Sequence, residues 1–217
     1  DLELLFLDFN TTEKVDLKLE ELAGLNNLKR LFILGATSTD LTIPSSLLGL
    51  EEIYIKGEMS NVESLGNLEN LVELKLDFPP DKSHETVDFT FLQNLKNLET
   101  LRIKGRSLEQ LGGGWEDIYP NLQNLNGLKE IILTGFPDPS LAAFEGLTDV
   151  ESISIHIGPE EEVNLSSLSS MKNLHSLGLE CHSVKSFSPL ESTNLARFWL
   201  SCDSTARGVP DLSPMAS

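Results

Sequence analysis

The stretch Leu92-Gln-Asn-Leu95-Lys-Asn-Leu98-Glu-Thr-Leu101-Arg-Ile103 contains two patterns in succession. Its first half places leucines three residues apart, which suits one turn of a short helix. Its second half has the form L-x-x-L-x-L, in which the closing alternation is typical of a strand with one buried face. The stretch therefore predicts a short helix or 3₁₀ turn, a tight connection and then a strand.

Both patterns recur along the chain. The L-x-x-L-x-L frame occurs in nine copies, whose first positions are Leu2, Leu28, Leu50, Leu71, Leu98, Leu128, Val150, Leu174 and Leu195. One such unit cannot cover its own apolar face, whereas stacked units share a continuous core. We therefore predict an α/β repeat solenoid, with a curved parallel sheet on the concave face and short helices or 3₁₀ turns on the convex face.

The repeated frame resembles the leucine-rich-repeat superfamily over nearly the whole chain. The stretch Ser186-Phe-Ser-Pro-Leu190-Glu-Ser-Thr-Asn-Leu195 is similar to the short repeats of the internalin and protein-phosphatase-regulator class. The stretch Thr42-Ile-Pro-Ser-Ser-Leu-Leu-Gly-Leu50 is similar to repeats of plant-type immune receptors. The resemblance implies a module that binds another molecule, with host interaction and immune recognition among the expected roles.

The ninth position of the frame departs from the superfamily pattern. In the superfamily an asparagine there usually bonds to neighbouring backbones in a ladder, but in this chain only the first copy has one, Asn10. Glycine precedes this position in four copies, namely Gly35, Gly57, Gly105 and Gly135. Because glycine adopts positive φ without steric cost, we predict that these glycines turn the chain after the strand.

The repeats define the domain organisation. Residues 1–205 are predicted to form one leucine-rich-repeat domain of about nine repeats. Residues 206–217 are too polar and proline-rich for another full repeat, and they are predicted to form a C-terminal tail or a poor cap.

Composition excludes several classes of function. The net charge of -18 is repelled by nucleic-acid backbones, so we expect no nucleic-acid partner. No apolar run is long enough for a membrane span, so we expect no membrane insertion. The sequence has no Gly-x-Ser-x-Gly, no phosphate-binding Gly-Lys-Ser/Thr loop and no His-Glu-x-x-His motif. We therefore predict a protein that is not an enzyme and has no cofactor.

Frame positions 3, 5 and 7 should point out of the concave face, because side chains alternate along a strand. Two neighbouring groups of residues occupy these positions. The apolar stripe consists of Phe6, Phe32, Leu34 and Tyr54. The basic patch consists of Lys56, Lys75, Arg102 and Lys104. Exposed apolar surface rimmed by charge often marks an interface, and aromatic residues and arginine are enriched in binding hot spots.

These two groups predict a protein partner with an acidic, partly apolar face. A glycan or a small anionic ligand is an alternative, in which Phe32 and Tyr54 would stack on the sugar. A structural spacer without a selective ligand is a further alternative, in which the charges only keep the exposed strands soluble.

A long insertion after the fifth strand contains Trp115 and Tyr119 beside three glycines. Loops of this length are often functional, so these aromatics are candidates for a flap that contacts the ligand. The alternative is that Trp115 covers the widened turn of a long repeat.

Cys181 and Cys202 are 21 residues apart and share frame position 8. Adjacent strands lie ~4.8 Å apart, which is within the range that a disulfide spans, so a bond between them is one expectation. Two stacked free thiols are the other. A disulfide requires an oxidising compartment, and it therefore favours an extracellular or cell-surface location over a cytoplasmic one. No spacing typical of a metal site is present.

Overall fold

The computed structural model describes residues 1–9, 13–79, 87–105, 115–136, 138–158 and 162–202, apart from the side chains of residues 115–117 and 119. The prediction for residues 206–217 lies outside this part of the chain. No helix among the described residues is long and apolar enough to cross a membrane.

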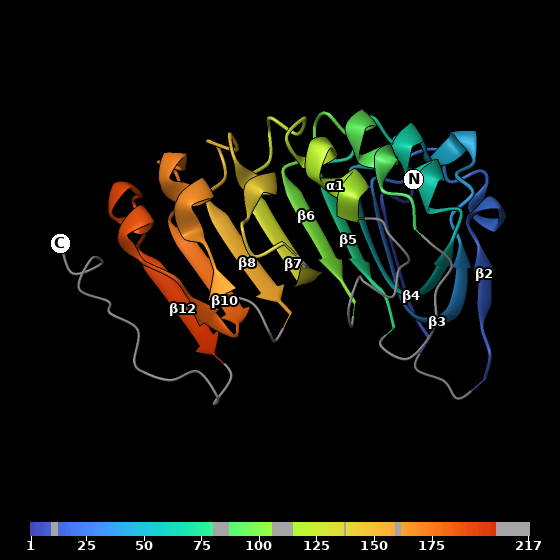
Figure 1. Cartoon of the computed structure of the whole chain (residues 1–217). Helices are drawn as coiled ribbons and strands as arrows, with labels where there is room; N and C mark the ends of the chain where they lie inside the picture. The colour runs from blue at the N-terminus through green and yellow to red at the C-terminus, as the bar shows by residue number, and fades with distance from the viewer. Residues whose placement is uncertain (10–12, 80–86, 106–114, 137, 159–161, 203–217) are drawn as a thin grey trace.

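Nine described strands, one at each copy of the frame, lie side by side in chain order in one parallel sheet (Figure 1). The strands are β1 (Leu4–Asp8), β3 (Arg30–Asp40), β4 (Glu52–Ser60), β5 (Glu73–Asp77), β6 (Thr100–Lys104), β7 (Glu130–Phe136), β8 (Ser152–Ile157), β10 (Ser176–Cys181) and β12 (Arg197–Cys202). Equal frame positions pair across neighbouring strands, as Phe32, Tyr54 and Lys75 do. The predicted parallel sheet is confirmed.

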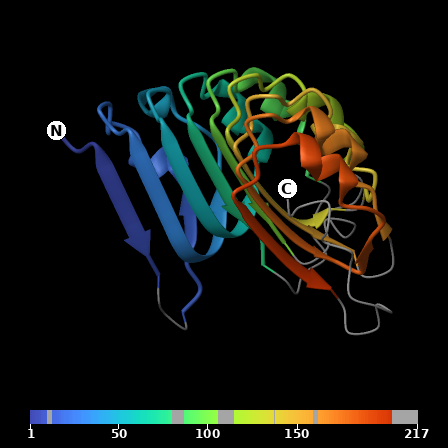
Figure 2. The same cartoon turned by 90° about the vertical axis from the view of Figure 1, so that its left-hand side faces the viewer.

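Short helical turns form the second layer, and Figure 2 shows the curvature of the whole. They are η1 (Leu19–Leu22), η2 (Ser45–Leu47), η3 (Val62–Asn67), η4 (Thr90–Asn94), α1 (Trp115–Leu122), η6 (Ala142–Phe144), η7 (Leu165–Ser170) and η8 (Ser188–Ser192). Neighbouring turns pack against one another, and α1 lies between η4 and η6. This layer confirms the predicted convex face.

The core consists of the frame residues, stacked from repeat to repeat. At positions 4 and 6 the side chains of β3 to β10, such as Leu31, Ile33 and Leu76, are fully or almost fully buried. In the two end strands the equivalent Leu5 and Phe198 are only partly buried. The difference arises because an interior strand is covered by two neighbours, whereas an end strand has one.

Three short strands were not predicted. Strand β2 (Asp16–Lys18) pairs with the second half of β3, and β9 (Glu162–Val163) pairs with β11 (Ser183–Val184) in a separate two-stranded sheet. Strand β3 continues beyond the frame to Asp40, and its second half pairs with β2 on one side and with the end of β4 on the other. Such short, polar strands lack the apolar alternation by which the other strands were predicted.

The prediction that glycines turn the chain after the strand is wrong in three of its four positions. Gly35, Gly57 and Gly135 have positive φ of 75°, 147° and 72°, but each lies within a strand. The pairing register shifts beside each of them: Gly35 and Gly135 are extra residues of bulges in β3 and β7, and Gly57 lies opposite the bulged part of β3. Gly105 is not among the described glycines with positive φ.

An asparagine ladder does exist, at the residue before frame position 1. In four repeats this side-chain amide donates to a backbone carbonyl of the preceding repeat. The pairs are Asn70 to Leu48 (3.4 Å), Asn97 to Glu69 (2.9 Å), Asn173 to Thr148 (3.1 Å) and Asn194 to Lys172 (2.6 Å). The ladder connects the turns that precede the strands, whereas frame position 9 lies beyond the opposite, C-terminal end of the L-x-x-L-x-L frame.

Candidate binding surface on the concave face

The register places frame position 5 in one continuous row across the sheet. Along this row Phe6 pairs with Phe32, Phe32 with Tyr54, Tyr54 with Lys75 and Lys75 with Arg102. Position 7 forms a second row, in which Asp77 of β5 is the strand-register partner of Lys56 on β4 and of Lys104 on β6. The sequence-predicted stripe and patch are therefore neighbours on strands β1 to β6.

The apolar stripe remains accessible at its outer end. Phe6 is 54% exposed, and its ring centroid lies 6.1 Å from that of Phe32. Phe32, Leu34 and Tyr54 are each partly buried. An apolar surface on a water-facing sheet is the property that motivated the prediction of an interface.

Asp77 forms the centre of a hydrogen-bonded cluster with Tyr54 and Arg102. The Tyr54 hydroxyl donates to Oδ2 of Asp77 at 2.9 Å, and Nε of Arg102 donates to Oδ1 at 2.9 Å. A second bond from Arg102 reaches Oδ2, so this ion pair is bidentate. The guanidinium carbon also lies 5.4 Å from the centre of the Tyr54 ring, within cation–π range. We call these three residues the Asp77 cluster.

The pKa values of Tyr54 and Arg102, the two donors to Asp77, are both raised. Burial and the hydrogen bond to Asp77 raise the pKa of Tyr54 above its usual value of 10. The hydrogen bond to Asp77 raises the pKa of Arg102 above its ordinary value. Both side chains are protonated at neutral pH even at their ordinary pKa values, so both are donors to Asp77 there, and the upward shifts extend this state to higher pH.

The basic patch is less basic than the sequence indicated. Arg102 is paired with Asp77, and Lys75 forms an ion pair with Glu73 at frame position 3 of the same strand. Among the described residues Lys56 and Lys104 have no ion-pair partner, and they flank Asp77 in the position-7 row. The interpretation as four available cations is therefore corrected to two, because the acidic residues of position 3 and Asp77 itself were left out of it.

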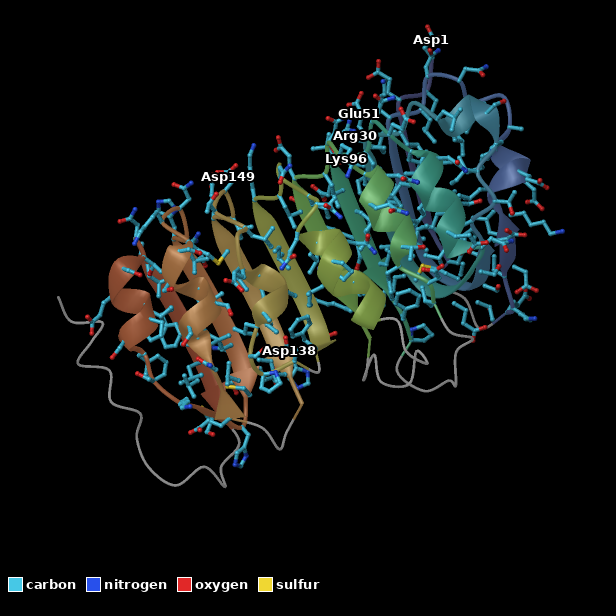
Figure 3. All side chains as sticks on the ribbon, turned by 45° about the horizontal axis from the view of Figure 1, so that its top comes forward. Asp1, Arg30, Glu51, Lys96, Asp138 and Asp149 are labelled. Atoms are coloured by element: carbon cyan, nitrogen blue, oxygen red, sulfur yellow. The ribbon has the colours of Figure 1, made fainter. Side chains whose placement is uncertain are left out.

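A second charged column borders this surface at frame position 2. Lys29 pairs with Glu51 at 2.8 Å, and Lys129 pairs with Glu99 at 2.8 Å. The hydrogen bond to Glu99 raises the pKa of Lys129. Both pairs are half exposed, so each contributes little to stability. Figure 3 shows Glu51, Lys96 and Asp149 along the edge where the strands begin, and Asp138 at the opposite edge.

Solved structures with the same arrangement of repeats exist in bacteria and plants. Internalin C2 of Listeria monocytogenes has a TM-score of 0.61 and 20% identity over 92% of this chain and 80% of its own. Internalin F of the same organism has a TM-score of 0.57 and 22% identity, over 83% of this chain and 55% of its own.

This chain has the leucine-rich-repeat fold. A third similar structure is the plant peptide hormone receptor RGFR1 in complex with RGF2, with a TM-score of 0.55 and 16% identity. The match covers 93% of this chain but 34% of the receptor. No protein-family model and no curated protein matches the sequence.

The leucine-rich-repeat fold separates Trp115 and Tyr119 from the rest of the predicted site. Both residues belong to the helix α1, which packs between η4 and η6 in the helical layer rather than on the sheet. Their side chains lie outside the described part of the chain. The end of the insertion forms a helix rather than a loop, and the predicted contact of these two side chains with a ligand stays a prediction.

Trp199 extends the row of frame position 5 to the far end of the sheet. It is 56% exposed, and it pairs with Gly178 of β10. A Cβ on Gly178 would lie 3.6 Å from the indole ring, so the tryptophan lies close to the glycine backbone. The position-5 row contained this signal, but Trp199 stands apart from the stripe and was left out of the predicted site.

The two cysteines of the leucine-rich-repeat chain lie side by side, as the spacing predicted. Cys181 and Cys202 are register partners on β10 and β12, and both are free thiols in this structure. Burial, the charge of Cys202 and a hydrogen bond with it raise the pKa of Cys181 to about 12. Within the described residues, no group of three or more His, Cys, Asp or Glu could hold a metal ion.

We expect iodoacetamide to modify Cys202 at least about tenfold faster than Cys181 in the reduced native protein at pH 8. Only the thiolate reacts, and Cys181 is buried with a raised pKa, whereas Cys202 is exposed. Mass spectrometry of the two peptides over time measures both rates, and equal rates would contradict the prediction. A thiol count on unreduced, denatured protein tests the disulfide separately, because two free thiols exclude it.

Proposed function

We propose that this chain is a protein-binding module whose partner docks on the concave face, over strands β1 to β6. The observation that carries the proposal is the exposed Phe6–Phe32 pair beside the Asp77 cluster. Aromatic residues and arginine are the types that dominate binding energy at protein interfaces. A repeat solenoid also presents a long continuous surface, which suits a protein or peptide better than a small molecule.

The Asp77 cluster supports this proposal because it is already ordered. Tyr54 and Arg102 are held by hydrogen bonds before any partner arrives. Ordering a long side chain at an interface costs about 0.5–1.5 kcal/mol, so a pre-ordered arginine avoids that loss. The same contacts weaken the glycan alternative at this position, because the guanidinium of Arg102 lies against the ring of Tyr54.

The partner that fits this surface has an acidic and partly apolar face. Apolar side chains of the partner would cover Phe6 and Phe32, and its carboxylates would meet Lys56 and Lys104. The chain as a whole has a net charge of -18, so it repels acidic molecules that do not match this arrangement. Charge therefore contributes to specificity, and the apolar stripe contributes to affinity.

We extend the proposal to host interaction or immune recognition, outside the cell or at its surface. The support is the likeness in fold to two internalins and to a plant receptor solved in complex with RGF2. A structural spacer stays the alternative, and it predicts that no selective ligand exists.

Selection of a phage-displayed library of random 12-residue peptides on the purified chain tests the proposal. We expect the enriched peptides to combine aspartate or glutamate with aromatic or aliphatic residues. The variant Lys56→Glu/Lys104→Glu should bind these peptides at least about tenfold more weakly, because each ammonium would become a repulsive carboxylate.

The control is Lys14→Glu/Lys185→Glu, which changes the net charge by the same amount at exposed residues outside frame positions 3, 5 and 7. Phe32→Ala tests the apolar stripe separately. Failure to enrich any sequence family, or equal loss of binding in the control, would reject the concave site.

A further inference from the structure

A groove opens in the helical layer, away from the sheet and from the proposed protein site. Its volume is about 830 Å³, and it is lined by residues of η2, η3 and η4 and of the connections that follow them. These three turns belong to consecutive repeats, so equivalent positions of neighbouring repeats line up along the groove. Its size is within the range of sites that bind small organic ligands.

Unpaired side-chain amides are the main chemical feature of the groove. Asn67, Gln93 and Asn94 line it, all three side chains are exposed, and none has a hydrogen-bond partner among the described residues. An amide donates two hydrogen bonds through its nitrogen and accepts through its oxygen. A sugar hydroxyl also donates and accepts, so a row of amides matches a row of hydroxyls.

The charges in the groove balance, which favours a neutral ligand. Glu69 and Lys96 occupy equivalent positions of neighbouring repeats and provide one charge of each sign. The wall between them is tied together, because the amide of Asn97 donates to the backbone carbonyl of Glu69 at 2.9 Å. An anion or a cation would meet a charge of its own sign here, whereas a neutral polyhydroxyl ligand can bond to both.

An apolar end completes the groove. Leu48 is 42% exposed there, beside the partly buried Ile43. The C–H face of a sugar ring is apolar, and it can cover such a side chain while the hydroxyls reach the amides. Gly66 in the middle adds no side chain, and a Cβ there would lie 3.1 Å from Nδ2 of Asn94. The glycine therefore leaves room for the Asn94 amide.

We propose that this groove binds a short neutral oligosaccharide. The site is separate from the concave face, and it does not depend on the proposed protein partner. Amides of η3 and η4 bond to the hydroxyls, Glu69 and Lys96 bond to hydroxyls at the same wall, and Leu48 covers one face of a sugar ring.

A printed array of neutral and anionic oligosaccharides, followed by isothermal titration calorimetry of the strongest neutral binder, tests the proposal. We expect binding to neutral members, and at least about tenfold weaker binding by the variant Gln93→Ala/Asn94→Ala. The control is Gln123→Ala/Asn124→Ala, which removes the amides at the equivalent positions of the next repeat, outside the groove, where they donate to the backbone carbonyls of Ala142 and Pro120. All four side chains are exposed, so both variants are expected to fold.

Three outcomes would overturn the proposal: no neutral saccharide binds, Gln93→Ala/Asn94→Ala binds as the unaltered chain does, or the control loses as much affinity. The concave-face variant Lys56→Glu/Lys104→Glu should bind the same saccharide unchanged. If that variant loses the saccharide, the sugar site lies on the concave face and the groove assignment is wrong, whether or not the peptide selection succeeds.

Discussion

Gly57→Ala is expected to destabilise the fold by about 3 kcal/mol or more. Gly57 has a φ of 147°, which alanine rarely adopts, and an added Cβ would lie 2.5 Å from the carbonyl oxygen of Ala36. That oxygen belongs to the backbone of β3, whose hydrogen bonds to β4 keep it in place. Relieving the clash would require the backbone of β3 to move, whereas a clash with the end of a flexible side chain is relieved by a change of rotamer.

Urea unfolding followed by far-UV circular dichroism measures this loss as a fall in the transition midpoint. Gly49→Ala is the matched control, because the nearest atom to its Cβ would be Nζ of Lys29 at 3.9 Å. The control should change the free energy of unfolding by less than about 1 kcal/mol. If the two variants unfolded at the same urea concentration, the position of Gly57 opposite the bulge of β3 would not need glycine.

Asp77→Ala is expected to destabilise the fold by about 2–3 kcal/mol. Asp77 is almost fully buried, and its removal leaves the Tyr54 hydroxyl and the Arg102 guanidinium without their acceptor. Chemical unfolding measures the loss. Glu73→Ala breaks the more exposed ion pair with Lys75, so it should lower stability by less than about 1 kcal/mol. Equal effects would show that the Asp77 cluster is no more important than a surface pair.

The same variant has a spectroscopic signature. In the unaltered chain the pKa of Tyr54 is raised, so this tyrosine contributes stability below pH 10 that is lost as the pH rises through its folded pKa. Asp77→Ala removes part of the cause, while burial remains. We therefore expect the Tyr54 transition in the absorbance titration at 295 nm, followed in a Tyr119→Phe background, to move to lower pH, and an unchanged transition would contradict the cluster.

The sequence predicted the repeated part of the fold well because the repeats report one physical requirement nine times. Each copy of L-x-x-L-x-L must bury the same positions, so a single ambiguous copy such as that of Val150 is corrected by its neighbours. The same repetition predicts the register, and it places Phe32, Tyr54 and Lys75 in one row from the sequence alone.

The parts that do not repeat were harder to predict. The second half of β3 pairs with β2 through polar residues, which carry no periodic signal. The glycines at position 8 indicated positive φ correctly, but a bulge and a turn both require it, and the local sequence does not distinguish them. Trp115 follows three glycines, a context typical of a loop, yet it begins a helix.

The candidate site was predicted in position but not in charge. The cations Lys75 and Arg102 occupy frame position 5 of β5 and β6, whereas their partners Glu73 and Asp77 occupy positions 3 and 7 of β5. A column-by-column account of both signs would have shown the pairing. The asparagine ladder also has a sequence signal, which is an asparagine directly before the residue at frame position 1, for example Asn97 before Leu98.

The end strand β1 has a consequence for how a partner would be held. Its outer side has no described neighbour, and Leu5 is less buried than the equivalent leucines of the interior. Backbone amides should therefore exchange with deuterium fastest at such an end and slowest in the middle of the stack. Because Phe6 lies on this end strand, a bound partner would stabilise β1, and slower deuterium uptake across β1 would report occupancy of the surface.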